Sequence, residues 1–471
     1  MQYYDERALK PPTQEQVMKN FAGLMAALLA AASTINAADY VVVIQSETAK
    51  QREWMAVASA LVARHDANIV TWQDSVHEVR KQLAASHPKY TCFVTPREQA
   101  TRQYVASIHQ LTRQLDSDPY TDTRWGILTG FDAANALAIA KHSEPLVVRR
   151  VVSGTELALE MCEEGLWYDE LVKNKMVRRD KGGPVRELKG PADTTSALID
   201  SLNLYKPDLF VTSGHATERN WQIGFTYRNG YFRSRGGQLF GEDTLRKTYA
   251  VESPNAKVYL PIGNCLMGHI DGPDAMALAW MNDAGVKQMI GYTVPTWFGY
   301  GGWGVLDYFV EQPGRYTLTD AFFANQHALI HSIETKSGNQ RGLEFDRDVV
   351  AFYGDPAWSA RMAPAKCAYQ QTLTKEGDTW TLRIRPNRGN DSFKPVNTNG
   401  AQRGWRPVVQ WLPFRVRDIE VTRGKDHAPV ITDDFVLVPN PREYDFSQPF
   451  EIVFQARSVS ESASASPGAE E

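Results

Sequence analysis

The chain contains the stretch Leu209-Phe-Val-Thr-Ser-Gly-His215 and, further along, the stretch Val258-Tyr-Leu-Pro-Ile-Gly-Asn-Cys265. Each is an apolar run of strand length that ends in a glycine turn and then in a residue capable of chemistry. Continuous apolar strands are typical of a parallel sheet covered on both faces. Catalytic groups in such sheets gather outside the carboxyl ends of the strands. If the two strands are neighbours, we expect His215 and Cys265 to lie side by side.

The same alternation of short apolar runs and longer helical stretches begins at residue 39. Further strands are predicted at 40–44, 68–72, 90–94, 125–129 and 287–292. Helices are predicted at 48–64, 75–85, 99–115 and 132–141. This order predicts an α/β fold with a mainly parallel sheet flanked by helices, in two half-domains, at 38–172 and 196–364.

The pattern changes after Pro364, where strand-length runs follow one another without helices. Strands are predicted at 379–385, 408–413, 418–422, 435–438 and 450–455, separated by Gly, Pro, Asn and Asp. Such spacing predicts a small antiparallel β-sandwich over 365–457. The Ser-, Ala- and Glu-rich residues 458–471 are predicted to form a disordered tail.

The basic segment 173–195 interrupts the α/β pattern and carries Gly182-Gly183-Pro184 in its middle. We expect an exposed, charged linker between the two half-domains. The dibasic pair Arg178-Arg179 leaves a second interpretation open, in which the segment is a processing site.

The N-terminal residues 1–37 have the three parts of a secretory leader. The apolar run 21–32 follows Met18-Lys19 and precedes a small-residue stretch at 33–37. It is too short to span a bilayer, which needs about 20 residues, so no stable membrane insertion is expected. The pattern predicts a signal peptide that starts at Met18, and a secreted or periplasmic bacterial protein. The alternative is a helix packed on the first domain of a cytoplasmic protein.

Composition excludes several classes of protein. The 471 residues include 51 Lys and Arg against 55 Asp and Glu, a net charge of −4, which gives no basic surface for nucleic acid. The length predicts more than one domain. The four cysteines, Cys92, Cys162, Cys265 and Cys367, are too few and too scattered for a disulfide scaffold or a zinc module.

Cys265 and His215 together suggest nucleophilic catalysis. A thiolate is the nucleophilic form of cysteine, and an imidazole can take up its proton or protonate a leaving amine. A helix expected over 273–284 would add a favourable dipole if it began near the cysteine. Taken singly, Cys265 could be a small buried hydrophobe and His215 a structural group.

Several blocks resemble the gingipain-type cysteine peptidases, which belong to the caspase-like clan. Thr212-Ser-Gly-His-Ala-Thr-Glu-Arg-Asn-Trp221 resembles the family's catalytic histidine block. Asn264-Cys-Leu-Met-Gly268, with the helix-like run after it, is similar to the nucleophile block. Tyr353-Gly-Asp-Pro-Ala357 resembles the turn that closes the catalytic domain, and the similarity spans about residues 39–364. The family commonly carries an immunoglobulin-like sandwich behind this region.

The resemblance implies a caspase-like endopeptidase in which Cys265 attacks the scissile carbonyl and His215 is the acid–base partner. Backbone N–H groups of Cys265 and of the Gly214–Ala216 turn would form the oxyanion hole. The family usually has glycine where this chain has Ala216, which would strain a turn that needs positive φ. The alternative is therefore a weak or inactive pseudo-peptidase that binds partners through the fold and the sandwich.

The resemblance also suggests a substrate pocket lined by Tyr292, Thr293 and Trp297, for which core packing is the alternative role. Members selective for Arg or Lys place an acid at the base of this pocket. Three acids of one loop are candidates for that place, Asp116, Asp118 and Asp122, and the alternative is that they are solvated loop residues. No preference for basic residues is therefore predicted from the sequence.

The expected partner is a polypeptide substrate, and the oligomeric state stays open. No cofactor and no catalytic metal are expected, although the resemblance allows a structural calcium ion. A metal site built from His327 and His331, with His269 and Asp271, is the weaker reading because the zinc-protease motif is missing. The glycine-rich stretch 299–304 is predicted to be a mobile loop beside the cleft.

Overall fold

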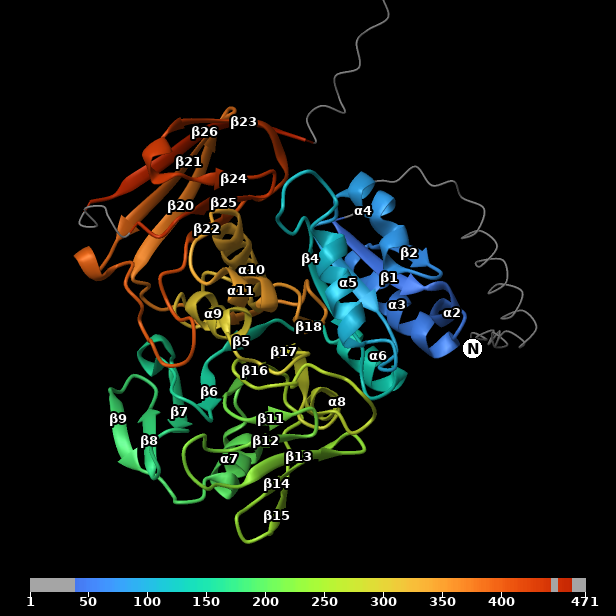
Figure 1. Ribbon diagram of the computed structural model, residues 1–471, viewed down its shortest axis with the longest axis vertical. Coiled ribbons are helices and arrows are strands. Elements are labelled where there is room, and N and C mark those ends of the chain that lie inside the picture. The colour runs from blue at the N-terminus through green and yellow to red at the C-terminus, as the bar shows by residue number, and fades with distance from the viewer. Residues whose placement is uncertain (1–38, 442–447, 460–471) are drawn as a thin grey trace, which may run out of the picture.

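A computed structural model describes residues 39–441 and 448–459 (Figure 1). The leader predicted at 1–37 lies outside these residues, as does the predicted tail from residue 460 onward. Within the described ranges, no helix combines the length and apolarity needed to cross a bilayer.

The centre of the molecule is a large, mainly parallel sheet. Its order in the described residues is β2-β1-β3-β4-β18-β17-β16-β10-β6-β7-β8-β9. Strand β18 runs antiparallel to β17 and parallel to β4, and β8 and β9 form an antiparallel hairpin at one edge. The first six strands of this order are β2 Asn68–Trp72, β1 Tyr40–Gln45, β3 Tyr90–Val94, β4 Arg124–Leu128, β18 Val350–Gly354 and β17 Val286–Tyr292. The other six are β16 Lys257–Pro261, β10 Leu209–Thr212, β6 Arg150–Ser153, β7 Glu164–Tyr168, β8 Lys175–Arg179 and β9 Val185–Lys189.

Helices flank this sheet, and some of them begin at a side-chain cap. Thr101 caps α5 by accepting from the Tyr104 N–H, and Thr317 and Asp320 form a capping box at the start of α10. The helices of the α/β unit are α2 Ser46–Ala49, α3 Arg52–His65, α4 Arg80–Ser86, α5 Arg102–Thr112, α6 Ala133–Lys141, α7 Thr195–Asp200, α8 Met276–Asn282, α9 Tyr300–Phe309, α10 Leu318–Glu334 and α11 Gln340–Asp346. Short helical turns occupy Val76–Val79, Leu159–Met161 and, with π-helical geometry, Ser201–Tyr205.

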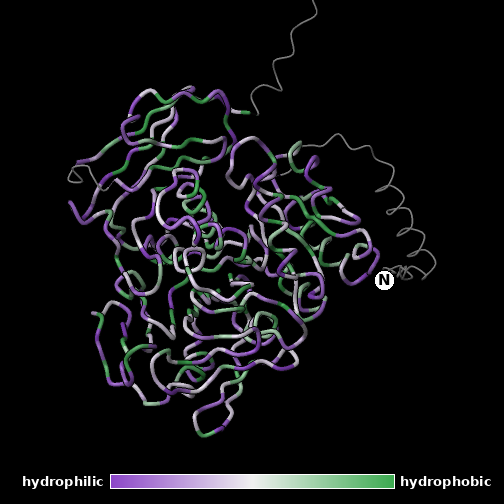
Figure 2. The backbone as a smooth tube through the Cα atoms, viewed as in Figure 1, coloured by the Kyte–Doolittle hydropathy of each residue, from purple (hydrophilic) through white to green (hydrophobic). Residues whose placement is uncertain are grey.

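The central strands are buried along their whole length, which is why their sequences are continuously apolar rather than alternating. Every residue of β4, β10, β16 and β18 is buried. Figure 2 shows the corresponding concentration of hydrophobic residues in the middle of the molecule. The predicted α/β class, with a mainly parallel sheet flanked by helices, is confirmed.

The turn after β18 ties the two ends of the α/β unit together. Asp355 accepts a hydrogen bond from the Tyr40 hydroxyl at 2.8 Å and lies 2.8 Å from His65 Nε2. Arg64 is 3.3 Å away. Although burial opposes ionisation, these partners hold the pKa of Asp355 below its ordinary value. The Gly-Asp-Pro segment therefore anchors α3 and β1 from the far end of the domain.

A smaller antiparallel sheet, which the sequence did not predict, lies between β10 and β16 in the chain. Its strands are β11 Ala216–Thr217, β12 Asn220–Gln222, β13 Tyr231–Arg235, β14 Gln238–Glu242 and β15 Thr248–Ala250. Trp221 and Phe232 pack between this sheet and the main one, where Phe210 and Trp280 surround them. The first strand of the insert follows His215 directly.

The C-terminal unit contains two antiparallel sheets with a shared core. One has the order β20-β21-β26-β23 and the other β22-β25-β24. The strands are β20 Tyr369–Glu376, β21 Thr379–Pro386, β22 Val408–Trp411, β23 Val416–Arg423, β24 Val430–Ile431, β25 Phe435–Val438 and β26 Phe450–Ser458. Trp380, Leu382 and Phe454 from the first sheet pack with Val408 and Val436 from the second. The predicted antiparallel sandwich is confirmed. A short pair, β5 Leu146–Val148 with β19 Ala360–Met362, lies where the chain leaves the α/β unit.

Two local expectations were wrong. The predicted loop at 173–195 contains β8 and β9, and Arg178-Arg179 lies in β8, whose backbone pairs with β7 on one side and β9 on the other. The predicted mobile loop at 299–304 is the buried first half of α9. Its glycines allow close packing, since a Cβ on Gly302 would lie 2.1 Å from the Ile262 carbonyl oxygen. The other domain boundaries stay predictions.

Candidate active site

Strands β10 and β16 are parallel neighbours, with Thr212 opposite Pro261. The two strands are therefore neighbours, which is the condition under which His215 and Cys265 were expected to lie close together. The chain leaves both strands at the carboxyl edge of the sheet, and His215 and Cys265 follow within a few residues. Both side chains line one open cavity of about 340 Å³.

A buried hydrogen-bond network holds the two strand ends together. Asn264 is fully buried, and its Oδ1 accepts from the Thr212 hydroxyl at 2.6 Å while its Nδ2 donates to the Gly214 carbonyl at 3.0 Å. The Tyr259 hydroxyl extends the network to Thr212 at 2.9 Å. Asn264 therefore fixes the separation of the histidine turn from the cysteine turn. The sequence analysis gave this residue no role.

The Cys265 thiol is partly exposed and lies in a polar setting. The Thr296 N–H donates to Sγ at 3.2 Å, and the thiol lies 3.8 Å from the Thr296 carbonyl oxygen, to which it can donate. Cys92 and Cys162, by contrast, are buried, and burial raises the pKa of both thiols, to about 12 for Cys162. Cys367 is also partly exposed, but it lies on the connection to the sandwich and outside the cavity.

His215 is exposed at the mouth of the cavity. Its ring stacks on Phe225, with centroids 4.6 Å apart and planes 29° from parallel. Among the described residues, no hydrogen bond joins this ring to the Cys265 thiol. In unliganded enzymes such bonds are often long and tighten only when substrate binds. The geometry is therefore that of an open pair whose members face the same cavity.

The turn between the two side chains needs glycine at one position. Gly214 has φ of +95°, and a Cβ there would lie 3.2 Å from Glu170 Oε2. Ala216 lies in β11, paired with Trp221, and is not among the residues with positive φ. The strain considered for Ala216 is therefore absent. The contribution of Gly214 and Ala216 to an oxyanion hole stays a prediction.

The helix expected after the cysteine is present but does not begin beside it in the chain. The predicted helix at 273–284 is shorter, and α8 begins only at Met276. Turns occupy the chain between Cys265 and this helix, so the α8 N-terminus does not lie next to the thiol in sequence. Leu266, directly after the cysteine, has φ of +60°, a strained conformation for leucine that marks a sharp turn at the proposed nucleophile.

Of the three predicted pocket residues, only Trp297 lines the cavity. Tyr292 is fully buried below it, where its hydroxyl donates to Asp346 at 3.0 Å, and Thr293 donates to the Val349 carbonyl. Tyr292 and Thr293 belong to the buried core, because the end of β17 lies beneath α9. The cavity instead has an apolar rim of Leu171, Phe225 and Trp297, which are 47%, 46% and 52% exposed.

The acid of this cavity is Glu170, a residue not expected from the sequence. It follows β7 and is 7% exposed. Its Oε1 accepts from the Thr155 hydroxyl at 2.7 Å, and its Oε2 has no hydrogen-bond partner among the described residues. Burial raises the pKa of Glu170 to about 7, against the effect of the Thr155 and Ser213 hydroxyl groups, which lower it. A buried carboxyl with one free oxygen thus lies in the wall of the cavity.

The acids considered from sequence lie elsewhere. Asp116, Asp118 and Asp122 do not line the cavity, and Arg415 of the C-terminal unit bonds to the Asp122 carbonyl. Their carboxylate oxygens lie within 4.8 Å of one another, and oxygen donors of this kind suit calcium. Burial raises the pKa of Asp118 to about 7 and of Asp122 to about 9. A structural calcium ion stays a prediction.

The histidine pair considered for a metal does not form a ligand group. His327 is fully buried between the rings of Tyr120, Trp411 and Phe435. Burial lowers its pKa to about 3. Among the described residues, neither it nor His331 gathers with other ligands, because α10 directs His327 into the core.

Comparison with known proteins gives a structural likeness without a sequence match. No family description and no curated protein matches the chain. The structure is similar to the Arg-specific cysteine proteinase gingipain R, with a TM-score of 0.47 and 10% identity over 90% of this chain and 98% of that one. It is also similar to the complex of Porphyromonas gingivalis RgpB pro- and mature domains, with a TM-score of 0.44 and 10% identity over 87% and 94%.

Proposed function

We propose that this protein is a cysteine endopeptidase. Its Cys265 thiolate attacks the carbonyl carbon of a peptide bond, and His215 protonates the amine that leaves. Water then hydrolyses the thioester, with His215 accepting the proton and Cys265 released. The observation that carries the proposal is the pairing of β10 with β16, which brings both side chains to one cavity.

The residues around the pair support this chemistry. Thr296 donates to the sulfur, and Asn264 holds the histidine turn against the cysteine turn. The apolar rim of Leu171, Phe225 and Trp297 offers contact to neighbouring residues of an extended peptide. The open cavity is suited to a chain that enters and leaves, as an endopeptidase requires.

Glu170 gives the cavity a chemical preference. Its Oε2 is buried without a partner, and such a group is costly unless a ligand satisfies it. A lysine or arginine side chain on the residue before the cleaved bond would supply both charge and donors. We therefore expect cleavage after basic residues, with Glu170 in place of the three acids considered from sequence.

Selective alkylation tests the nucleophile. Iodoacetamide should label Cys265 much faster than Cys92 or Cys162, because only the first combines exposure with a donor to its sulfur. Cys265→Ala should abolish peptide cleavage, and His215→Ala should lower turnover by orders of magnitude with little change in stability. Cys367→Ala is the matched control, since it removes another partly exposed thiol. Full activity in Cys265→Ala would overturn the proposal.

One observation favours a second candidate, a pseudo-peptidase that binds peptides without cleaving them. The His215 ring stacks on Phe225 instead of bonding to the thiol. The two functions separate with a peptidyl chloromethyl ketone, which alkylates Cys265 in an active dyad with loss of chloride. A wild-type protein that binds the peptide but is not alkylated would establish the second candidate.

A further inference from the structure

A segment of the C-terminal unit reaches into the candidate active site. Residues 396–406, here called the strap, connect β21 to β22 of the sandwich. Three of them, Asn399, Gly400 and Ala401, line the cavity that contains Cys265. Asn399 also lines a neighbouring open hollow of about 560 Å³ beside β7 and β8. The strap therefore lies over the carboxyl edge of the sheet.

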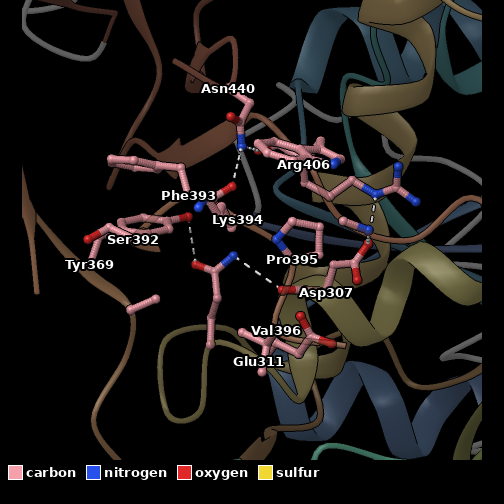
Figure 3. Close-up of a pocket in the computed structure, with 14 residues that line it drawn as sticks. Asp307, Glu311, Tyr369, Ser392, Phe393, Lys394, Pro395, Val396, Arg406 and Asn440 are labelled. Atoms are coloured by element: carbon pink, nitrogen blue, oxygen red, sulfur yellow. Dashed lines mark hydrogen bonds and ion pairs between the residues drawn. The ribbon is translucent and has the colours of Figure 1, made fainter. Parts of the chain in front are cut away.

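Buried charges fix the strap to α9. Arg403 Nε bonds to Asp307 Oδ1 at 2.7 Å, and the same guanidinium pairs with Glu311. Arg406 Nε lies 3.2 Å from Asp307 Oδ2, and its guanidinium stacks 3.8 Å from the Tyr300 ring centroid. Figure 3 shows Arg406 and Asp307 joined in this way beside Glu311. These charged side chains are between 2% and 7% exposed.

The backbone takes part in this set, and burial raises the pKa of Glu311 to about 8 although the charge of Arg403 opposes that shift. Two guanidinium groups face two carboxylates, and the Gly404 N–H adds a hydrogen bond to Asp307 Oδ2 at 2.9 Å. Breaking such a buried set leaves an unpaired charge, so the arrangement holds one geometry. A linker that only passes over a surface does not need a buried set of charged groups of this kind.

The strap meets the site through close packing and one hydrogen-bond relay. Gly400 has φ of +89°, and a Cβ there would lie 2.4 Å from the Trp303 ring, which itself lines the cavity. Asn399 Nδ2 donates to Thr155 Oγ1 at 3.2 Å, and Thr155 donates onward to Glu170 Oε1 at 2.7 Å. The strap thus touches both the floor of the cavity and the group that orients its acid.

We propose that the strap is a specificity-determining wall of the substrate pocket. Ala401 sets the width available to the substrate side chain, and Asn399 is a positioning residue that orients Glu170 through Thr155. The role rests on the proposed peptidase function and adds that the C-terminal unit takes part in substrate recognition. The pocket so formed admits a long basic side chain because its wall ends in a small residue.

Two variants test the wall, with peptides that differ only at the residue before the cleaved bond. Ala401→Leu should lower kcat/KM for a lysine peptide about 10-fold relative to an alanine peptide, because it narrows the pocket. Ala365→Leu, an exposed alanine outside the cavity, is the control. The iodoacetamide rate at Cys265 should stay unchanged, since this reagent needs no pocket. Equal effects of Ala401→Leu on both peptides would overturn the role of Ala401.

The hydrogen-bond relay from Asn399 through Thr155 to Glu170 is tested with two peptides that carry lysine or norleucine before the cleaved bond. These two side chains differ chiefly in charge. Asn399→Ala should lower the lysine preference roughly 10- to 100-fold, through misplacement of Glu170. Thr155→Val should do the same and Thr155→Ser should retain the preference, a pattern that simple loss of stability does not produce. Gln103→Ala, which removes an exposed amide on α5, is the control. An unchanged preference in both Asn399→Ala and Thr155→Val would overturn the relay.

The outcome separates this role from the function on which it rests. A wild-type protein that cleaves none of the three peptides refutes the peptidase function and the strap's role with it. If the wild-type protein cleaves the peptides and the strap variants keep the same ratios of kcat/KM between them, only the proposed role of the strap is refuted.

Discussion

The raised pKa of Glu170 predicts a pH dependence of stability that one substitution removes. The carboxyl has a pKa of about 7 in the folded protein, against 4.5 as the ordinary value. Each pKa unit corresponds to about 1.4 kcal/mol, so the difference amounts to about 3 kcal/mol. Below pH 4.5 the group is neutral in both the folded and unfolded states. Above pH 7 it is ionised in both, and only the folded state bears the cost of burying the charge.

Glu170→Gln keeps the shape of the side chain and an acceptor for Thr155 but never ionises. We expect the two proteins to have similar stability near pH 4. By pH 8 the variant should be more stable than the wild type by about 3 kcal/mol, with most of the change between pH 4.5 and 7. Urea denaturation across this range measures the difference. Glu344→Gln on α11 is the control, because that carboxyl is exposed to water when the protein is folded.

The same ionisation should appear in substrate preference. A lysine side chain is attracted to the ionised form of Glu170, so the ratio of kcat/KM for lysine over norleucine should rise as pH passes 7. Taking the ratio removes any pH effect that the two peptides share. Glu170→Gln should give a low ratio that does not depend on pH. A stability difference that stays constant from pH 4 to pH 8 would refute the reasoning, whatever the kinetics show.

Three further substitutions test other parts of the structure. Asp307→Ala should destabilise the protein by about 3–5 kcal/mol in thermal or urea unfolding, because it leaves the buried Arg406 without its carboxylate and Arg403 with Glu311 alone; a loss below about 1 kcal/mol would show that the cluster is not buried. Gly302→Ala should cost about 1–3 kcal/mol, since its Cβ would lie 2.1 Å from the Ile262 carbonyl oxygen, and a stability equal to wild type would contradict this packing. Ala216→Gly should leave kcat/KM within about 2-fold, because this position is not in the left-handed region; a large gain in activity would show that alanine strains the turn.

The parts of the fold predicted from sequence are those that local pattern determines. The strands 90–94 and 209–212 match the structure because buried parallel strands are continuous apolar runs. The insert β11–β15 was missed, since its short strands alternate with glycine and charged residues and lie partly exposed. The Gly-rich start of α9 was misjudged because close packing against Ile262 selects glycine despite its low helix propensity.

The residues of the candidate site also divide into those that a local sequence pattern reveals and those that it does not. The strand ends at His215 and Cys265 were visible because each follows an apolar run. Glu170 follows a similar run at 165–168, and this signal could have found it. The contacts of the strap could not be predicted, because Arg403 and Asp307 are distant in the chain and no local pattern links them.

The place of β18 in the sheet has a consequence for how the chain is made. This strand is the last of the main sheet to be synthesised, yet it lies between β4 and β17. Until residues 350–354 leave the ribosome, both neighbours present unpaired edges, which are prone to wrong association. A fragment that ends before Val350 is therefore two incomplete sheets and not a smaller domain. Expression of the α/β unit alone must include β18 and the Asp355 turn that follows it.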